Sequence, residues 1–203
     1  MRDAESLPSL DVQHLWYEVR RQRPSWKTLA LAAVDEGEAP IRLARELGHL
    51  AARETGQRAL VVSTATRPDA PRGSAPLPKD PWVVLLNDRA KPIAGGSEHV
   101  SYLAFDHVDG DWAERALADA PQAMRHLADG SLGYASAIFA LESVLTRPAG
   151  IQLARAVDTV VLCVRLGESS LDDTRRITEV IGRDKILGTL AIRSSDTRAG
   201  PTR

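Results

Sequence analysis

The stretch from Thr28 to Arg45, TLALAAVDEGEAPIRLAR, brings three carboxylates into a turn between an apolar run and a helical pattern. They belong to Asp35, Glu36 and Glu38. In an α/β protein the turn after the first buried strand can hold a phosphate loop, which needs glycines, a lysine and a serine or threonine. This turn contains one glycine, Gly37, and no lysine. Its composition is therefore that of an acidic turn.

Two uses of these carboxylates are open from the sequence. Together with Glu142, which follows another predicted strand, Asp35, Glu36 and Glu38 are candidate acid, base or metal-binding groups of an enzyme that uses this crevice. Alternatively, they stabilise the start of the following helix, where the helix dipole favours negative charge. We favour the second use, because carboxylates that flank a helix start commonly form a solvated cap. We expect neither a metal ion nor a cofactor at this turn.

Outside this turn, no cluster of reactive residues stands out. The five histidines have no metal-ligand spacing, and no dinucleotide fingerprint of the form G-x-G-x-x-G is present. The single cysteine, Cys163, lies inside the apolar run TVVLCVRL, which indicates a buried side chain and a reducing compartment. We therefore predict no catalytic residue and no metal ligand.

The elements that position the acidic turn alternate between buried strands and amphipathic helices. Continuous apolar runs predict strands, and apolar residues at spacings of three and four predict helices. Strands are predicted at residues 28–34, 58–64, 82–87, 99–105, 134–141, 159–164 and 186–192, and helices at residues 11–23, 41–55, 111–129, 148–156 and 170–181. Pro121 is expected to divide one of these helices. This alternation predicts a doubly wound α/β fold, with a mostly parallel sheet flanked by helices and a ligand crevice at the carboxyl ends of the strands.

Length and composition predict one α/β domain at residues 11–193. A surface excursion is expected at residues 65–81, which hold five prolines, and disordered tails are expected at residues 1–10 and 194–203. The 26 basic residues nearly balance the 27 acidic ones, so no global field attracts nucleic acid. The sequence has no run of about 20 apolar residues and no apolar signal core, which predicts a cytoplasmic protein that does not insert into a membrane.

Three stretches carry a resemblance to a known family. They are LWYEVRRQRPSWKTLALAAVDEGEAPIRLARELG, GQRALVVSTATRP, and ARAVDTVVLCVRLGESSLDDTRRITEVI followed by ILGTLAI. In pattern and order, from Val12 to Ile192, they resemble the ParA/MinD-like deviant-Walker P-loop ATPases. Among these they are most similar to the cytoplasmic domain of bacterial tyrosine kinases of capsule and exopolysaccharide synthesis. The resemblance implies a P-loop NTPase fold of the MinD/ParA type.

The functional residues of that family do not carry over. No lysine occurs between Lys27 and Lys79, so the phosphate-loop lysine is missing. Two aspartate positions of the kinases hold Ser63 and Ala65, and the Walker-B aspartate position holds Ala140. The resemblance thus implies a degenerate nucleotide site at Gly37, Glu38, Ala39, Pro40, Ser63, Ala65 and Ala140. We expect no nucleotide cofactor there.

These losses lead to a functional hypothesis. Phosphoryl transfer depends on positioning and charge stabilisation, so little catalysis remains without the lysine and the acidic metal anchors. The tyrosine-rich tail of the kinases is also absent, because no tyrosine follows Tyr134. The resemblance then implies a catalytically inactive regulatory or partner subunit in exopolysaccharide or capsule synthesis or export. Its expected partner is a membrane chain-length or export protein, which would hold it at the inner membrane; homodimer formation stays open.

Overall fold

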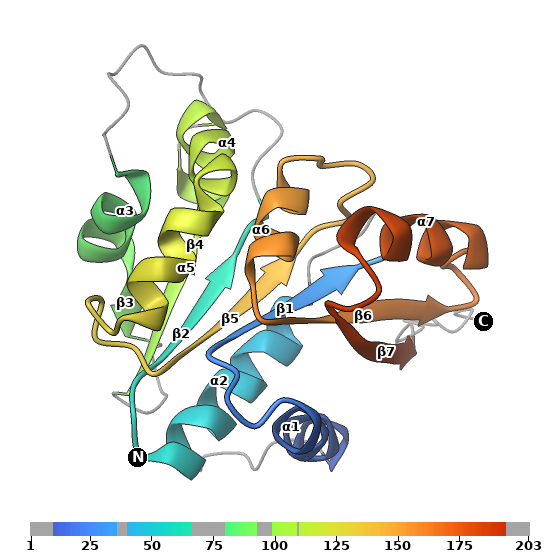
Figure 1. The fold of residues 1–203 in the computed structure, drawn as a ribbon, viewed down its shortest axis with the longest axis horizontal. Helices are drawn as coiled ribbons and strands as arrows, with labels where there is room; N and C mark the ends of the chain where they lie inside the picture. Colours follow the sequence, from blue (N-terminus) through green and yellow to red (C-terminus); the bar gives the residue numbers. More distant parts are fainter. Residues whose placement is uncertain (1–9, 36–39, 66–79, 93–98, 109, 194–203) are drawn as a thin grey trace, which may run out of the picture.

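The computed structural model describes residues 10–35, 40–65, 80–92, 99–108 and 110–193, and in these ranges seven strands form one sheet. Their order is β3-β4-β2-β5-β1-β6-β7 (Figure 1). The strands are β1 (Thr28–Ala33), β2 (Ala59–Ser63), β3 (Lys91–Pro92), β4 (Val100–Ala104), β5 (Ser136–Leu141), β6 (Thr159–Leu166) and β7 (Ile186–Arg193). All neighbours are parallel except β3 and β4, which are antiparallel. The predicted mostly parallel sheet is confirmed.

Helices cover both faces of the sheet (Figure 1). On one face lie α1 (Leu10–Gln22) and α2 (Ile41–Thr55); on the other lie α3 (Pro81–Arg89), α4 (Gly110–Ala118), α5 (Ala120–Ala128), α6 (Gly150–Ala156) and α7 (Leu171–Ile181). A short 3₁₀ turn, Phe105–His107, follows β4. Alternate residues of a central strand enter one of two apolar clusters: Leu60 and Val62 of β2 join the α3–α7 side, and Val61 joins the α1–α2 side.

Local signals at the helix ends act as the sequence predicts. α2 ends at Gly56, whose φ of 66° is the left-handed conformation that favours glycine. α7 begins after Ser170, whose hydroxyl accepts hydrogen bonds from Asp172 N and Asp173 N. Near Pro121 the predicted long helix divides into α4 and α5. These boundaries therefore follow from local chemistry.

The prediction of a strand at residues 82–87 is wrong, because these residues lie in α3. Asp80 caps this helix by accepting a hydrogen bond from Val83 N (3.2 Å), and Pro81 occupies its first turn. Trp82 is fully buried and donates its indole N–H to the carbonyl of Ala116 in α4 (2.6 Å). A short apolar run fits a buried strand or a buried helix equally well, so the cap and the tertiary contacts decide.

Three further observations bear on the sequence predictions. Cys163 is buried, and burial followed by the nearby charge of Asp35 raises the pKa of its thiol to about 12. Within the described ranges, no helix combines the length and the apolar character needed to cross a membrane. Leu10, predicted to belong to the N-terminal tail, is the first residue of α1, so that tail was predicted one residue too long. The rest of both predicted tails and most of the Pro-rich excursion lie outside the described residues.

Candidate functional site

In a doubly wound sheet the ligand crevice lies beyond the carboxyl ends of the strands, so we examine the turns that follow β1, β2, β5 and β6. Among the described residues, two clusters of polar side chains lie at this end of the sheet. The Arg147 cluster consists of Thr64, Glu114, Glu142 and Arg147. The Arg165 cluster consists of Asp35, Arg165, Glu168 and Ser169.

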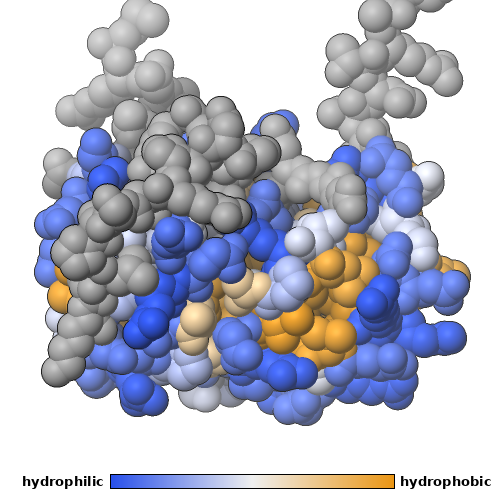
Figure 2. All heavy atoms as spheres, turned by 90° about the horizontal axis from the view of Figure 1, so that it is seen from above, coloured by the Kyte–Doolittle hydropathy of each residue, from blue (hydrophilic) through white to orange (hydrophobic). Residues whose placement is uncertain are grey.

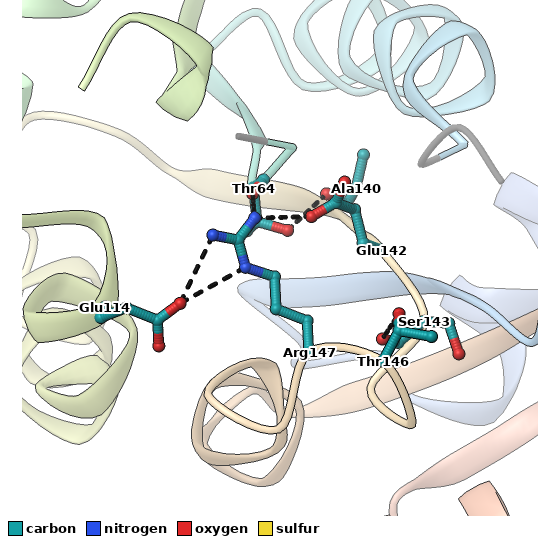
Figure 3. A network of polar contacts seen from close by, with 7 residues as sticks. All are labelled: Thr64, Glu114, Ala140, Glu142, Ser143, Thr146 and Arg147. Carbon is teal, nitrogen blue, oxygen red and sulfur yellow. Dashed lines mark hydrogen bonds and ion pairs between the residues drawn. The ribbon is translucent and has the colours of Figure 1, made fainter. Parts of the chain in front are cut away.

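Arg147 lies at the centre of the first cluster and reaches three elements (Figure 3). Its Nη1 donates to the carbonyl of Thr64 after β2 (3.3 Å) and to Glu142 Oε2 after β5 (2.7 Å). Its Nε and Nη2 both lie 3.4 Å from Oε1 of Glu114 on α4. The Arg147 side chain is only 20% exposed. Two carboxylates of the chain itself therefore neutralise this half-buried cation.

Hydroxyl groups fix the turns around this cluster. Ser143 is buried and donates its hydroxyl to the carbonyl of Val34, the residue after β1 (3.0 Å). The Ala140 carbonyl accepts from the backbone N–H of Thr64 (3.1 Å) and from its hydroxyl (3.3 Å). Thr146 donates its hydroxyl to the Ser143 carbonyl (2.9 Å) (Figure 3). These bonds leave the turns after β1, β2 and β5 tied to one another.

The Arg165 cluster joins the turn after β1 to the turn after β6. Ser169 donates its hydroxyl to Asp35 Oδ2 (2.8 Å) and accepts from the backbone N–H of Arg165 (2.9 Å). The Arg165 guanidinium lies 3.4 Å from Asp35 Oδ1 and donates to Glu168 Oε2 (2.9 Å). As in the Arg147 cluster, one arginine is paired with two carboxylates, and an anionic ligand would have to displace them.

The predicted role of Asp35 in capping α2 is wrong. The residue that precedes the helix is Pro40, and it makes no side-chain capping hydrogen bond. The carboxylate of Asp35 instead accepts a hydrogen bond from the Ser169 hydroxyl and pairs with the Arg165 guanidinium. Hydrogen bonds to an ionised group are stronger than those between neutral groups. The other predicted residues of this turn, Glu36, Gly37, Glu38 and Ala39, lie outside the described residues.

The structure brings two of the degenerate positions together. Ser63 of β2 and Ala140 of β5 are partners in the sheet register, and Ala140 also pairs with Leu31 of β1. Ser63 is 5% exposed and Ala140 is fully buried in the α1–α2 cluster. Ala65 follows β2 and is half-buried. Neighbouring positions at which the resemblance places acidic residues thus hold a hydroxyl and a methyl group.

The acidic residues proposed as catalytic or metal-binding groups do not gather in the described part of the chain. Asp35 belongs to the Arg165 cluster and Glu142 belongs to the Arg147 cluster. Among the described residues, no group of three or more histidine, cysteine, aspartate or glutamate side chains could hold a metal ion. This arrangement of described residues holds in place the turns that follow β1, β2, β5 and β6.

The sequence predictions missed Arg147 and Arg165. Each lies near the carboxyl end of a strand, and the order of strands in the sheet determines which carboxylates they meet. The only feature of the sequence that could have pointed to these two residues is an arginine within a few residues of a predicted strand end. Its spacing from Glu114 or Asp35 along the chain says nothing about their contact.

The strand order, the helices on both faces and the polar turns at the carboxyl ends define a fold of the P-loop MinD/ParA-like class. No family model matches the sequence, and no curated protein matches it. Solved structures do match. Their sequence identities to this chain, 13% to 17% for the three structures described next, are low, so the likeness shows the fold alone.

Among those structures are kinase domains of bacterial tyrosine kinases. The VpsO kinase domain has a TM-score of 0.69 and 16% identity, covering 92% of this chain and 94% of that chain. The kinase domain of the Escherichia coli tyrosine kinase ETK has a TM-score of 0.68 and 13% identity, covering 95% of this chain and 78% of that chain. McdA from Cyanthece has a TM-score of 0.54 and 17% identity, covering 82% of this chain and 71% of that chain. The chain is therefore similar in fold to tyrosine kinase domains and to McdA.

Proposed function

We propose that this protein is a catalytically inactive relative of the bacterial tyrosine kinase domains that acts as a regulatory or partner subunit. The similarity in fold to the VpsO and ETK kinase domains supports the choice of family. The observation that carries the inactive role is the state of the carboxyl-end crevice. Its two described arginines, Arg147 and Arg165, are each paired with two carboxylates of the chain.

The residues of the degenerate site give this proposal a second support. Mg²⁺ with a triphosphate needs an acidic anchor and a lysine, and catalysis consists mainly of positioning and charge stabilisation. Ser63 and Ala140, neighbours in the sheet, supply no charge, and no lysine lies between Lys27 and Lys79. Binding of a nucleotide would also have to break ion pairs that are partly shielded from water.

A membrane chain-length or export protein of exopolysaccharide synthesis is the partner that we propose from the sequence resemblance, with the chain in the cytoplasm at the inner membrane. The surface offers apolar contact points. Leu166 and Leu171, on either side of the turn between β6 and α7, are 54% and 87% exposed. Figure 2 shows apolar side chains gathered in its right-hand half, the half in which Figure 1 places α7. Exposed apolar side chains of this kind favour protein contacts.

Calorimetric titration with Mg–ATP tests the inactive role. We expect no binding tighter than about 100 µM, which corresponds to roughly −5.5 kcal/mol. The variant Arg147→Ala serves as a comparison, since it frees Glu142 and Glu114 and leaves the crevice more acidic. Tighter binding by the unmodified protein would overturn the proposal.

The partner role needs a separate experiment. The full chain is co-expressed with the chain-length protein of its own gene neighbourhood and purified through that protein in detergent. We expect co-purification, weakened in Leu171→Asp and unchanged in Gln152→Asp, a substitution at an exposed polar position of α6. Absence of the complex under conditions that retain each protein would contradict the partner role and leave the nucleotide result unaffected.

A further inference from the structure

The two edge strands of the sheet are built differently (Figure 1). β3 consists of two exposed residues, Lys91 and Pro92, and proteins use short strands, lysine and proline to keep sheet edges from pairing. β7 has eight residues, and its residues 186–192 include neither proline nor a charged side chain. In the part of the chain that the structure describes, no strand lies beyond β7. β7 therefore has the length and composition of an edge that pairs.

Backbone hydrogen bonds show how the neighbouring strand β6 alternates between its two partners. The Cys163 carbonyl accepts from Val34 N on the β1 side (3.1 Å). Val160 N donates to the Lys185 carbonyl on the β7 side (2.8 Å). In a parallel pair the peptide groups of successive residues point to opposite neighbours. The N–H and carbonyl groups of even-numbered residues of β6 therefore point to β7, and those of odd-numbered residues point to β1.

The register then identifies the peptide groups of β7 that have no strand partner within residues 10–35, 40–65, 80–92, 99–108 and 110–193. After an irregularity between Val160 and Val161, Cys163 of β6 lies opposite Leu190 of β7. The peptide groups of Leu190 and Ile192 consequently point to β6. Those of Thr189 and Ala191 point to the free edge, and each offers one N–H and one carbonyl there.

We propose that β7 pairs with β7 of a second copy of this chain, antiparallel across a two-fold axis. The register that satisfies the free groups sets Thr189 of one copy opposite Ala191 of the other, so each such pair exchanges two hydrogen bonds. Leu190 then lies opposite its own counterpart at the axis, on the α1–α2 side of the sheet. Ile192 of one copy lies opposite Gly188 of the other.

Side-chain size favours a second copy as the occupant. A Cβ built on Gly188 meets nothing within 4 Å, so space is open there for the larger side chain of Ile192. Thr189 and Ala191, which would lie opposite each other, are both small and exposed.

The oligomeric state of the full chain tests this proposal. Sedimentation velocity over about 1 to 100 µM is expected to show a monomer–dimer equilibrium. Ala191→Pro removes an N–H that points away from β6, so the variant is expected to be monomeric with an unchanged thermal midpoint. Ala191→Lys is a second variant that keeps the backbone intact, and like charges at the interface are expected to raise the dimer Kd at least about tenfold. Gln152→Lys, at an exposed position of α6, is the matched control.

Cross-linking checks the register. Leu190→Cys is expected to form a disulfide-linked dimer under mild oxidation, because the two residues would lie opposite each other as a non-hydrogen-bonded pair. Gly188→Cys, which would lie opposite Ile192, is expected to form none, and the native Cys163 is buried. A monomer at every concentration, including one whose own C-terminal residues pair with β7, would overturn the proposal. A dimer that survives both Ala191 substitutions would do the same.

Discussion

The two ends of the sheet use their carboxylates in different ways. At the amino ends of β1 and β6, Asp158 Oδ2 accepts from Lys27 N (2.8 Å), Thr28 N (2.8 Å) and the Thr28 hydroxyl (3.0 Å). At the carboxyl ends, Asp35 and Glu142 pair with arginine side chains. Backbone donors fix the path of the chain, whereas side-chain ion pairs occupy the place where this class of fold binds ligands. The amino end is therefore a structural joint, whereas the described carboxylates at the carboxyl end are paired with arginines of the chain itself.

Restoring an acidic anchor at the carboxyl end tests whether the two ends differ in this way. We expect Ala140→Asp to lower the free energy of unfolding by about 3–5 kcal/mol, because the new carboxylate is fully buried beside Ser63 and Leu31 with no cation described next to it. Urea unfolding measures the loss. Ala65→Asp, at a half-buried position after β2, is the control and is expected to cost much less. A stable Ala140→Asp variant that binds Mg–ATP would contradict the account.

The structural role of the amino end predicts the next largest effect. We expect Asp158→Ala to lower the free energy of unfolding by about 2 kcal/mol, since it leaves two backbone N–H groups and the largely buried hydroxyl of Thr28 without their acceptor. Asp158→Asn retains an acceptor oxygen and is expected to lose less. Chemical unfolding monitored by tryptophan fluorescence gives both values. Equal losses for the two variants would show that charge alone matters at this joint.

At the carboxyl end, Arg147→Ala is expected to cost about 1–2 kcal/mol, since it removes the bond to the Thr64 carbonyl and unpairs Glu142 and Glu114. Arg21→Ala is the matched control, because Arg21 also pairs with a glutamate, Glu18, but is 70% exposed. We expect no measurable change for the control. Unfolding free energies at low and high salt distinguish the two sites, and equal effects would show that Arg147 is an ordinary surface charge.

The carboxylate of Asp80 accepts hydrogen bonds both from a backbone N–H and from side chains. We expect its replacement to have a smaller, pH-dependent effect on stability. Burial alone would raise its pKa, but the hydrogen bonds from Val83 N, His126 and Gln122 outweigh burial and hold the pKa below its ordinary value. A lowered pKa contributes stability that is present above the unfolded-state value of about 3.9 and is lost as the pH falls through the folded-state value. Asp80→Asn should therefore be less stable than the unmodified protein at neutral pH, and the two unfolding curves should converge in acid. A constant difference down to the acid limit would contradict this role.

Much of the fold is predictable from the sequence. The helix at residues 41–55 coincides with α2, because its periodic apolar positions and Gly56 specify both its face and its end. The buried strands of the parallel sheet are equally plain, since they are continuous apolar runs. The run at residues 82–87 was ambiguous for a physical reason: burial on all sides removes the periodicity that separates a helix from a strand.

The candidate site is less predictable from the sequence. Ser63 and Ala140 could be placed because they lie at strand ends in an expected order. The partners of Asp35 and Glu142 could not, because Ser169 is 134 residues away from Asp35 in the chain and Arg147 reaches back to α4. Such contacts depend on the order of strands in the sheet and on the rotamers of long side chains. Local sequence patterns specify neither.

The most direct test of the central claim is the effect of Mg–ATP on stability. A ligand that binds only the folded state raises the free energy of unfolding by RT ln(1 + [L]/Kd), about 2.7 kcal/mol when its concentration is 100 times its Kd. Urea unfolding of the full chain is measured with and without about 10 mM Mg–ATP, with ionic strength matched by salt. We predict the same free energy of unfolding in both conditions. A gain of about 2.7 kcal/mol would correspond to a Kd near 100 µM and would contradict the loss of the nucleotide site.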